Sequence, residues 1–133
     1  MNPSIIALYL RVIGWLFAGF GIAYVFFPTL LLEQSGMQTP SAAAKADVYA
    51  MYAGLQIGFG LWLLACAKHR DLQPAGLLSI VFIFGGIAAG RTLGVLYYAS
   101  YDAFNISALC IEWPGSLFAL YLYKKHCKTL SAS

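Results

Sequence analysis

Two ionisable residues interrupt long apolar stretches of the sequence, where a side chain able to carry charge is unusual. Arg91 lies within the run of residues 77–98, and Glu112 lies within the run of residues 104–123. Such a group at the centre of a membrane helix costs about 2.5–3.5 kcal/mol on insertion scales, so it normally faces the protein interior and has a partner. A carboxylate is too short to reach the membrane surface and must be paired, hydrated or protonated. The sequence therefore predicts either a structural ion pair or the floor of a small cavity.

Other polar residues are expected to share the depth or the helix face of this pair. At 100° per residue, Asn105 falls on the same face as Glu112. At 1.5 Å per residue, Gln56 and Arg91 lie at similar depths, about 10–12 Å inside the outer boundary. Arg11 approaches from the cytoplasmic side or extends to the nearer membrane surface. The predicted buried polar cluster comprises Glu112, Arg91, Gln56, Tyr52, Tyr49, Asn105 and Arg11.

The composition of the chain is that of a membrane protein. Of its 133 residues, 61% are hydrophobic and only 10% are charged, whereas soluble chains carry roughly 25% charged residues. Apolar runs occupy residues 5–27, 48–67, 75–98 and 103–123, and each has the roughly 20 residues that a helix needs to cross a bilayer. We therefore expect an all-α integral membrane bundle of four transmembrane helices, formed by a single domain of residues 1–133.

Basic residues gather on one side of this predicted topology. Residues 68–70 between the second and third helices read Lys-His-Arg, and three lysines follow the fourth helix within residues 124–128. The opposite side carries Glu33, Lys45, Asp47 and Asp102. Because positive charge favours the cytoplasm, both the N- and C-termini are expected there. The basic ends are expected to meet anionic lipid head groups.

Proline, serine and glycine positions predict how the helices end and pack. Pro28 should end the first helix, Ser41 should cap the second, and Pro114 should bend the fourth beside Glu112. Small residues spaced by four permit close approach of a neighbouring helix. This spacing occurs at Gly54 and Gly58, and again at Gly86, Gly90 and Gly94.

The cysteines and histidines give little support for a metal site. Cys66, Cys110 and Cys127 are odd in number and are expected to be free thiols. Cys66, His69, His126 and Cys127 could in principle meet at the inner face as zinc ligands, but adjacent side chains on a helix diverge by 100°. We expect no metal and no cofactor. The chain has no phosphate-binding loop, Rossmann turn, Ser-His-Asp set or nucleic-acid-binding pattern.

Three segments carry a family resemblance: the string YAGLQIGFG at residues 52–60, GRTLG at residues 90–94, and Glu112 ahead of Trp113 and Pro114. With these motifs, residues 8–123 resemble a family of small four-helix bacterial membrane proteins known only as a domain of unknown function. That family is itself similar to the DoxX-like four-helix proteins. The resemblance implies a bacterial inner-membrane location and a four-helix bundle, and it implies no reaction.

The polar cluster supports three functional hypotheses. The leading one is a non-enzymatic membrane protein that binds a hydrophobic, lipid-like small molecule or serves as an accessory subunit of a larger membrane complex. Membrane lipids and further copies of the protein are its other expected partners. A proton-coupled small-molecule transporter would use Glu112 as its titrating group, but the nearby Arg91 favours the charged carboxylate. A membrane-embedded isomerase or oxidoreductase would use Glu112 as base and Tyr52 as acid, but it lacks a second strong acid or base.

Overall fold

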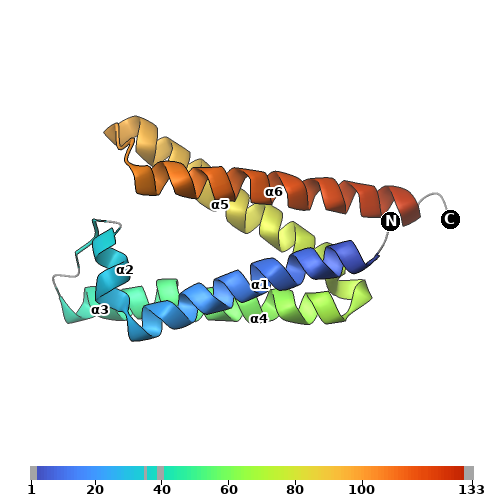
Figure 1. Ribbon diagram of the computed structural model, residues 1–133, viewed down its shortest axis with the longest axis horizontal. Helices are drawn as coiled ribbons and strands as arrows, with labels where there is room; N and C mark the ends of the chain where they lie inside the picture. The colour runs from blue at the N-terminus through green and yellow to red at the C-terminus, as the bar shows by residue number, and fades with distance from the viewer. Residues whose placement is uncertain (1–2, 35, 39–40, 131–133) are drawn as a thin grey trace. The chain divides into compact units, whose positions relative to one another are not determined.

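The structure, a computed structural model, describes residues 3–34, 36–38 and 41–130 (Figure 1). Within these ranges the protein is almost entirely helical and has no strand. Four helical segments are long and apolar enough to cross a membrane, and they comprise Ile5–Phe26, Ala42–Lys68, Arg70–Tyr98 and Ala103–Lys128. The all-α fold with four apolar helices is thus confirmed. The side of the membrane on which the termini lie stays a prediction.

The chain divides into two compact units. One comprises Ala7–Arg70, here called the α1–α4 unit, and the other comprises Asp71–Ser133 together with Met1–Ile6. The second unit is built mainly from one helical hairpin, here called the α5–α6 hairpin. The expectation of a single domain stays a prediction, and each unit is described by itself.

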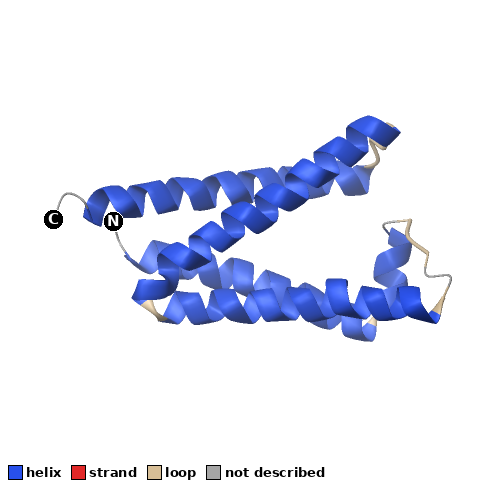
Figure 2. Cartoon of the chain, turned by 180° about the vertical axis from the view of Figure 1, so that it is seen from behind, coloured by secondary structure: helices blue, strands red, loops and turns tan. Residues whose placement is uncertain are grey.

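The α1–α4 unit contains more helical elements than its two apolar runs suggest (Figure 2). They are α1 (Pro3–Phe26), α2 (Pro28–Gln34), α3 (Ala42–Val48), the π-helix η1 (Tyr49–Gly54) and α4 (Leu55–Lys68). The first helix ends before Pro28, as expected, and Pro28 begins α2. Ser41 caps α3, because its Oγ accepts a hydrogen bond from the Ala44 N–H at 3.1 Å. The second long helical segment therefore begins six residues before its apolar run.

Glycines bring α1 and α4 into close contact, but at different positions from those predicted. A Cβ added at Gly60 would lie 2.6 Å from the backbone N of Ala18, and one at Gly21 would lie 2.9 Å from the carbonyl O of Ala53. By contrast, a Cβ at Gly58 would meet no atom within 4 Å. Within the α1–α4 unit, the close contact is made by Gly60 and Gly21 and not by Gly54 and Gly58. The π-helix takes more residues per turn than an α-helix, so a constant 100° step misplaces the faces that follow it.

The α5–α6 hairpin consists of α5 (Gln73–Tyr98) and α6 (Ala103–Leu130), and the short 3₁₀ helix η2 (Arg70–Leu72) precedes it in the sequence. Ala99 ends α5 in the left-handed conformation, with φ of 51°, and the Ser100 N–H bonds the Val95 carbonyl at 3.1 Å. Further down, Ser116 Oγ on α6 donates to the Val81 carbonyl of α5 at 3.1 Å. These bonds close the turn and join the two helices.

Helix α6 continues through Pro114 and extends seven residues past the predicted end at residue 123. The apolar pattern predicts where the helix would leave the lipid. It does not predict where the helix ends, because the backbone hydrogen bonds can continue in water. Lysine is a good helix former, so Lys124, Lys125 and Lys128 prolong the helix rather than end it.

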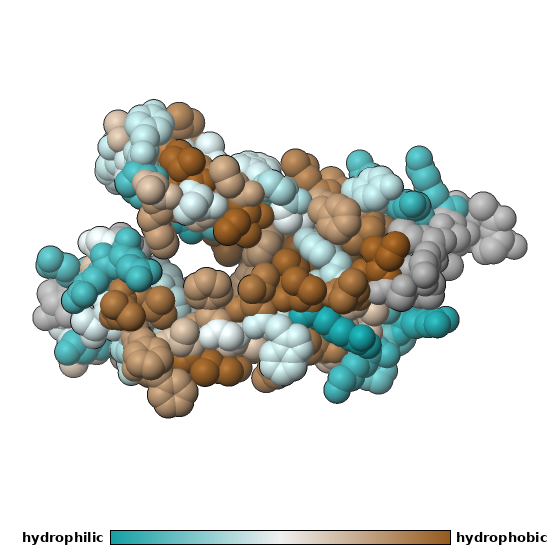
Figure 3. Space-filling view, in the orientation of Figure 1, coloured by the Kyte–Doolittle hydropathy of each residue, from teal (hydrophilic) through white to brown (hydrophobic). Residues whose placement is uncertain are grey.

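Large apolar side chains are exposed along the helices (Figure 3), among them Phe82 at 73% and Leu93 at 69%. Hydrophilic residues gather toward the helix ends in the same view. Exposed apolar surface of this extent is costly in water but is the normal outer surface of a protein in lipid. The four apolar helices and their surface are consistent with a membrane protein.

Candidate functional site

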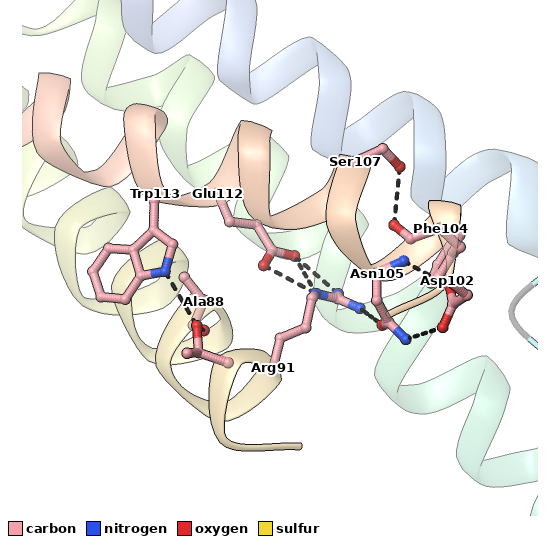
Figure 4. Close-up of polar contacts among 9 residues, drawn as sticks. Ala88, Arg91, Asp102, Phe104, Asn105, Ser107, Glu112 and Trp113 are labelled. Carbon is pink, nitrogen blue, oxygen red and sulfur yellow. Dashed lines mark hydrogen bonds and ion pairs between the residues drawn. The ribbon is translucent and has the colours of Figure 1, made fainter. Parts of the chain in front are cut away.

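Arg91 and Glu112 face each other across the α5–α6 hairpin (Figure 4). Arg91 Nε donates to both carboxylate oxygens of Glu112, at 3.1 and 3.0 Å, and Nη2 donates to Oε1 at 2.9 Å. The two side chains are 24% and 12% exposed. This is the bidentate geometry in which arginine binds a carboxylate most strongly. The ion pair expected from the sequence is therefore present in the hairpin.

Asn105 extends the ion pair toward the turn between the helices. Its Oδ1 accepts a hydrogen bond from Arg91 Nη1 at 3.1 Å, while its Nδ2 donates to Asp102 Oδ2 at 2.7 Å and to Ser100 Oγ at 3.2 Å. The amide thus accepts from the cation and donates to the anion. Because both of its ends are engaged, Asn105 fixes the position of Arg91 relative to the turn.

Asp102 organises this turn and begins α6. Its Oδ1 accepts from the backbone N–H of Asn105 at 2.9 Å, the bond of a helix N-cap, and its Oδ2 accepts from Ser100 Oγ at 2.7 Å. The backbone N–H of Asn105, together with the side chains of Ser100 and Asn105, lowers the pKa of this exposed carboxyl to about 2. Asp102 is therefore an anion at neutral pH.

Two aromatic residues of α6 complete the surroundings of the ion pair. The Arg91 guanidinium carbon lies 5.7 Å from the centre of the Phe104 ring, within range of a cation–π interaction. Trp113 Nε1 donates to Thr92 Oγ1 at 3.2 Å, and Thr92 in turn donates to the Ala88 carbonyl at 2.7 Å. Thr92 and Trp113, which follow Arg91 and Glu112 in the sequence, thereby join the two helices beside the ion pair.

An open hollow of about 620 Å³ lies beside Arg91 on the α5–α6 hairpin. A Cβ added at Gly86, Gly90 or Gly94 would meet no atom of the α5–α6 hairpin within 4 Å, so the hairpin leaves this glycine strip open. The hairpin itself makes no contact over these glycines, and the prediction that they bring a neighbouring helix into close contact stays a prediction. The hollow is lined by Gly86, Ile87, Gly90, Arg91, Gly94, Val95, Tyr98, Ser100 and Asn105.

The other four residues of the predicted cluster belong to the α1–α4 unit. Tyr49 donates to the Val25 carbonyl at 3.4 Å. Tyr52 donates to Met37 Sδ at 3.7 Å, and its ring centre lies 5.2 Å from that of Tyr24. Gln56 is half-buried and Arg11 is exposed. The structure therefore brings together Arg91, Glu112 and Asn105, and participation of the other four stays a prediction.

Ser100, Asp102 and Phe104 contact the site but were not predicted as part of it. Asp102 had a recognisable signal, because an aspartate just before an apolar helical run is a common N-cap. Ser100 and Phe104 had none, since their contacts depend on how the turn folds.

No three His, Cys, Asp or Glu side chains lie together to hold a metal in the described part of the chain. Cys66 is buried, whereas Cys110 and Cys127 are exposed, and all three are free thiols, as predicted.

The four apolar helices and the polar pair held between two of them define a class of small multi-span helical proteins compatible with a membrane. Residues 5–123 match the family model described as Domain of unknown function (DUF4345), and the chain belongs to this family. Neither a curated protein nor a solved structure matches the chain. The resemblance to a family of unknown function is confirmed, and the likeness to the DoxX-like proteins stays a prediction.

Proposed function

We propose that this protein resides in the bacterial inner membrane with both termini in the cytoplasm and binds a hydrophobic, lipid-like small molecule without transforming it. The binding site is the hollow beside Arg91 on the α5–α6 hairpin. The observation that carries this proposal is the combination of a glycine strip that the hairpin leaves open with a fixed guanidinium at its edge. The strip leaves room for an apolar chain, and the guanidinium offers a polar contact for a head group.

Arg91 retains donors for such a head group. A guanidinium has five N–H groups. Its Nε–H is shared between the two Glu112 oxygens, one Nη2–H bonds Glu112, and one Nη1–H bonds Asn105. One N–H on each terminal nitrogen has no partner among the described residues, and Arg91 itself lines the hollow. A bound molecule with a hydrogen-bond acceptor would satisfy these donors.

The two catalytic or transport alternatives receive less support. A transporter that uses Glu112 would have to rearrange the three short contacts by which Arg91 holds this side chain. An isomerase with Tyr52 as its acid would need that hydroxyl at the pair, and Tyr52 instead donates to Met37 within its own unit. An accessory subunit would use the same hollow for a segment of a partner protein.

The test is the identity and amount of molecules that copurify with the protein. Gly90→Leu should fill the hollow without clashing, because a Cβ there meets no atom. Gly58→Leu is the matched control, since Gly58 is equally open but lies on α4. We expect mass spectrometry of extracts to find a bound amphiphile in the parent and in Gly58→Leu, and to find it depleted in Gly90→Leu. Equal content in all three proteins, or a protein chain in place of a small molecule, would overturn the proposal.

A further inference from the structure

The C-terminal part of α6 carries three lysines on one side of the helix. Lys124, Lys125 and Lys128 are exposed, and together with Tyr121 they follow the i, i+3, i+4, i+7 spacing that places side chains on one face. Ser116, whose hydroxyl bonds a carbonyl of α5, precedes Tyr121 by five residues and so points about 140° away from it. This surface, here called the lysine face, is therefore turned away from α5.

Two aromatic side chains connect the lysine face to the apolar part of α6. The ammonium nitrogen of Lys125 lies 5.8 Å from the centre of the Tyr121 ring, within range of a cation–π interaction. Tyr121 in turn stacks on Phe118, one helical turn earlier, with ring centres 6.3 Å apart. Tyrosine is enriched where lipid meets water, because its ring is apolar and its hydroxyl is polar. The order of Phe118, Tyr121 and the lysines thus matches the passage from hydrocarbon to head groups.

The charge at this end of the hairpin is positive. Residues 113–133 contain no Asp or Glu. Glu112 pairs with Arg91, and Asp102 caps α6 at the turn, so both carboxylates serve the opposite part of the hairpin. Asp71 precedes α5 and leaves the three lysines in excess. An ammonium group donates hydrogen bonds and accepts none, so a cluster of them favours an anion with several acceptor oxygens, such as a phosphate.

We propose that the lysine face binds the phosphate group of an anionic phospholipid, whose acyl chains lie along Phe118 and the apolar surface of α6. Lysines at a membrane surface attract anionic lipids, and Tyr121 sets their distance from the hydrocarbon. A free phosphate would satisfy the ammonium groups but would make no use of the aromatic pair beside them. This surface is separate from the hollow beside Arg91, and the inference stands whether or not the hollow binds a ligand.

The test compares two lipids that share their acyl chains and differ in the charge of the head group. Palmitoyl-oleoyl phosphatidylglycerol is an anion, and palmitoyl-oleoyl phosphatidylcholine is zwitterionic. Glycerol phosphate is a phosphate head group without acyl chains. Binding of each probe to the full chain, purified in a nonionic detergent, is measured at neutral pH by native mass spectrometry. We expect phosphatidylglycerol to bind the parent about tenfold or more tightly than phosphatidylcholine.

Substitutions of the lysines assign this preference to the lysine face. Lys124→Gln, Lys125→Gln and Lys128→Gln combined should remove it, whereas arginine at the same three positions keeps the charge and should retain it. Glutamine and arginine are as good helix formers as lysine, so both variants keep α6 helical. Lys125→Gln alone should weaken phosphatidylglycerol binding roughly fivefold. Lys45→Gln is the matched control, since it removes one exposed lysine from α3, and it should leave the preference unchanged.

Four results would overturn the proposal. Equal binding of the two lipids to the parent, or an unchanged preference in the triple glutamine variant, would exclude the lysine face as the site. Glycerol phosphate binding as tightly as phosphatidylglycerol would assign the face to a free phosphate. Loss of the preference in the arginine variant would exclude charge as its cause. Gly90→Leu alters only the hollow and should keep the preference, so a loss there would place the anionic lipid at the hollow instead.

Discussion

Replacing Arg91 with methionine leaves the Glu112 carboxylate without the cation that contacts both of its oxygens. Loss of one partner from a buried ion pair typically costs about 3–5 kcal/mol, because the other charge remains uncompensated. The two side chains are 24% and 12% exposed, so the lower end of this range applies. Asn105 also loses a donor, which adds about 1 kcal/mol. We expect Arg91→Met to lower the free energy of unfolding by about 3–4 kcal/mol.

Adding Glu112→Leu to Arg91→Met should recover much of this loss. The double variant has no unpaired charge, and replacing both members of an ion pair with apolar residues is often close to neutral. What remains lost is the bond to Asn105 and the cation–π contact with Phe104, about 1 kcal/mol or slightly more together. The double variant should therefore be about 2 kcal/mol more stable than Arg91→Met alone.

The measurement is reversible unfolding in mixed detergent micelles, followed by circular dichroism, for the parent, both single variants and the double variant. Arg11→Met is the matched control, because Arg11 also lies in an apolar helix but is exposed and has no ion pair within the described ranges. It should change stability by less than about 1 kcal/mol. Additive losses at positions 91 and 112 would refute the reasoning, since they would mean that the two charges do not stabilise each other. A loss at Arg11 as large as that at Arg91 would place Arg11 in the polar cluster.

Three further predictions concern the turn, the α1–α4 packing and the topology. Folding lowers the pKa of Asp102 from 3.8 to about 2. Its ionised form therefore stabilises the fold fully above pH 3.8, and this stabilisation is lost as the pH falls through 2. Asp102→Asn should therefore flatten the dependence of melting temperature on pH between 4 and 2, and an unchanged profile would exclude this role. Gly21→Leu should destabilise by about 1–3 kcal/mol or more in denaturant titrations because its Cβ would lie 2.7 Å from Ile57, whereas Gly19→Leu, with open space, should be tolerated. A tag inserted after Gln38 should be labelled by membrane-impermeant reagents in intact cells, whereas a C-terminal tag should not. Labelling of the C-terminal tag alone would show that the orientation is the opposite of the predicted one.

The sequence was sufficient to predict the four apolar helices and the ion pair, for a common physical reason. Lipid offers no hydrogen bonds or counter-charges, so each long apolar run must be helical and each charge within it needs a partner. Arg91 and Glu112 were therefore conspicuous in the sequence. Asn105 could be added because it shares a helix face with Glu112 at an interval of seven residues.

The features that the sequence did not predict depend on contacts between segments. The π-helix at Tyr49–Gly54 has no distinct composition, and the close contact of α4 with α1 is made at Gly60. The glycine strip of α5 has the spacing of a packing motif, yet α6 does not pack on it. Spacing shows that a close approach is sterically allowed, and only the tertiary structure decides whether a neighbour makes use of it.

The turn between α5 and α6 explains why the hollow is open beside a charged residue. Arginine has a long side chain that could lie across the glycine strip and fill it. Glu112 and Asn105, both on α6, instead hold the guanidinium toward their own helix. Asn105 is in turn held by Asp102, whose carboxylate also caps the helix. The N-cap of α6 and the position of Arg91 are thus parts of one hydrogen-bonded chain, in which Glu112 holds one side of the guanidinium and the capped turn, through Asn105, holds the other.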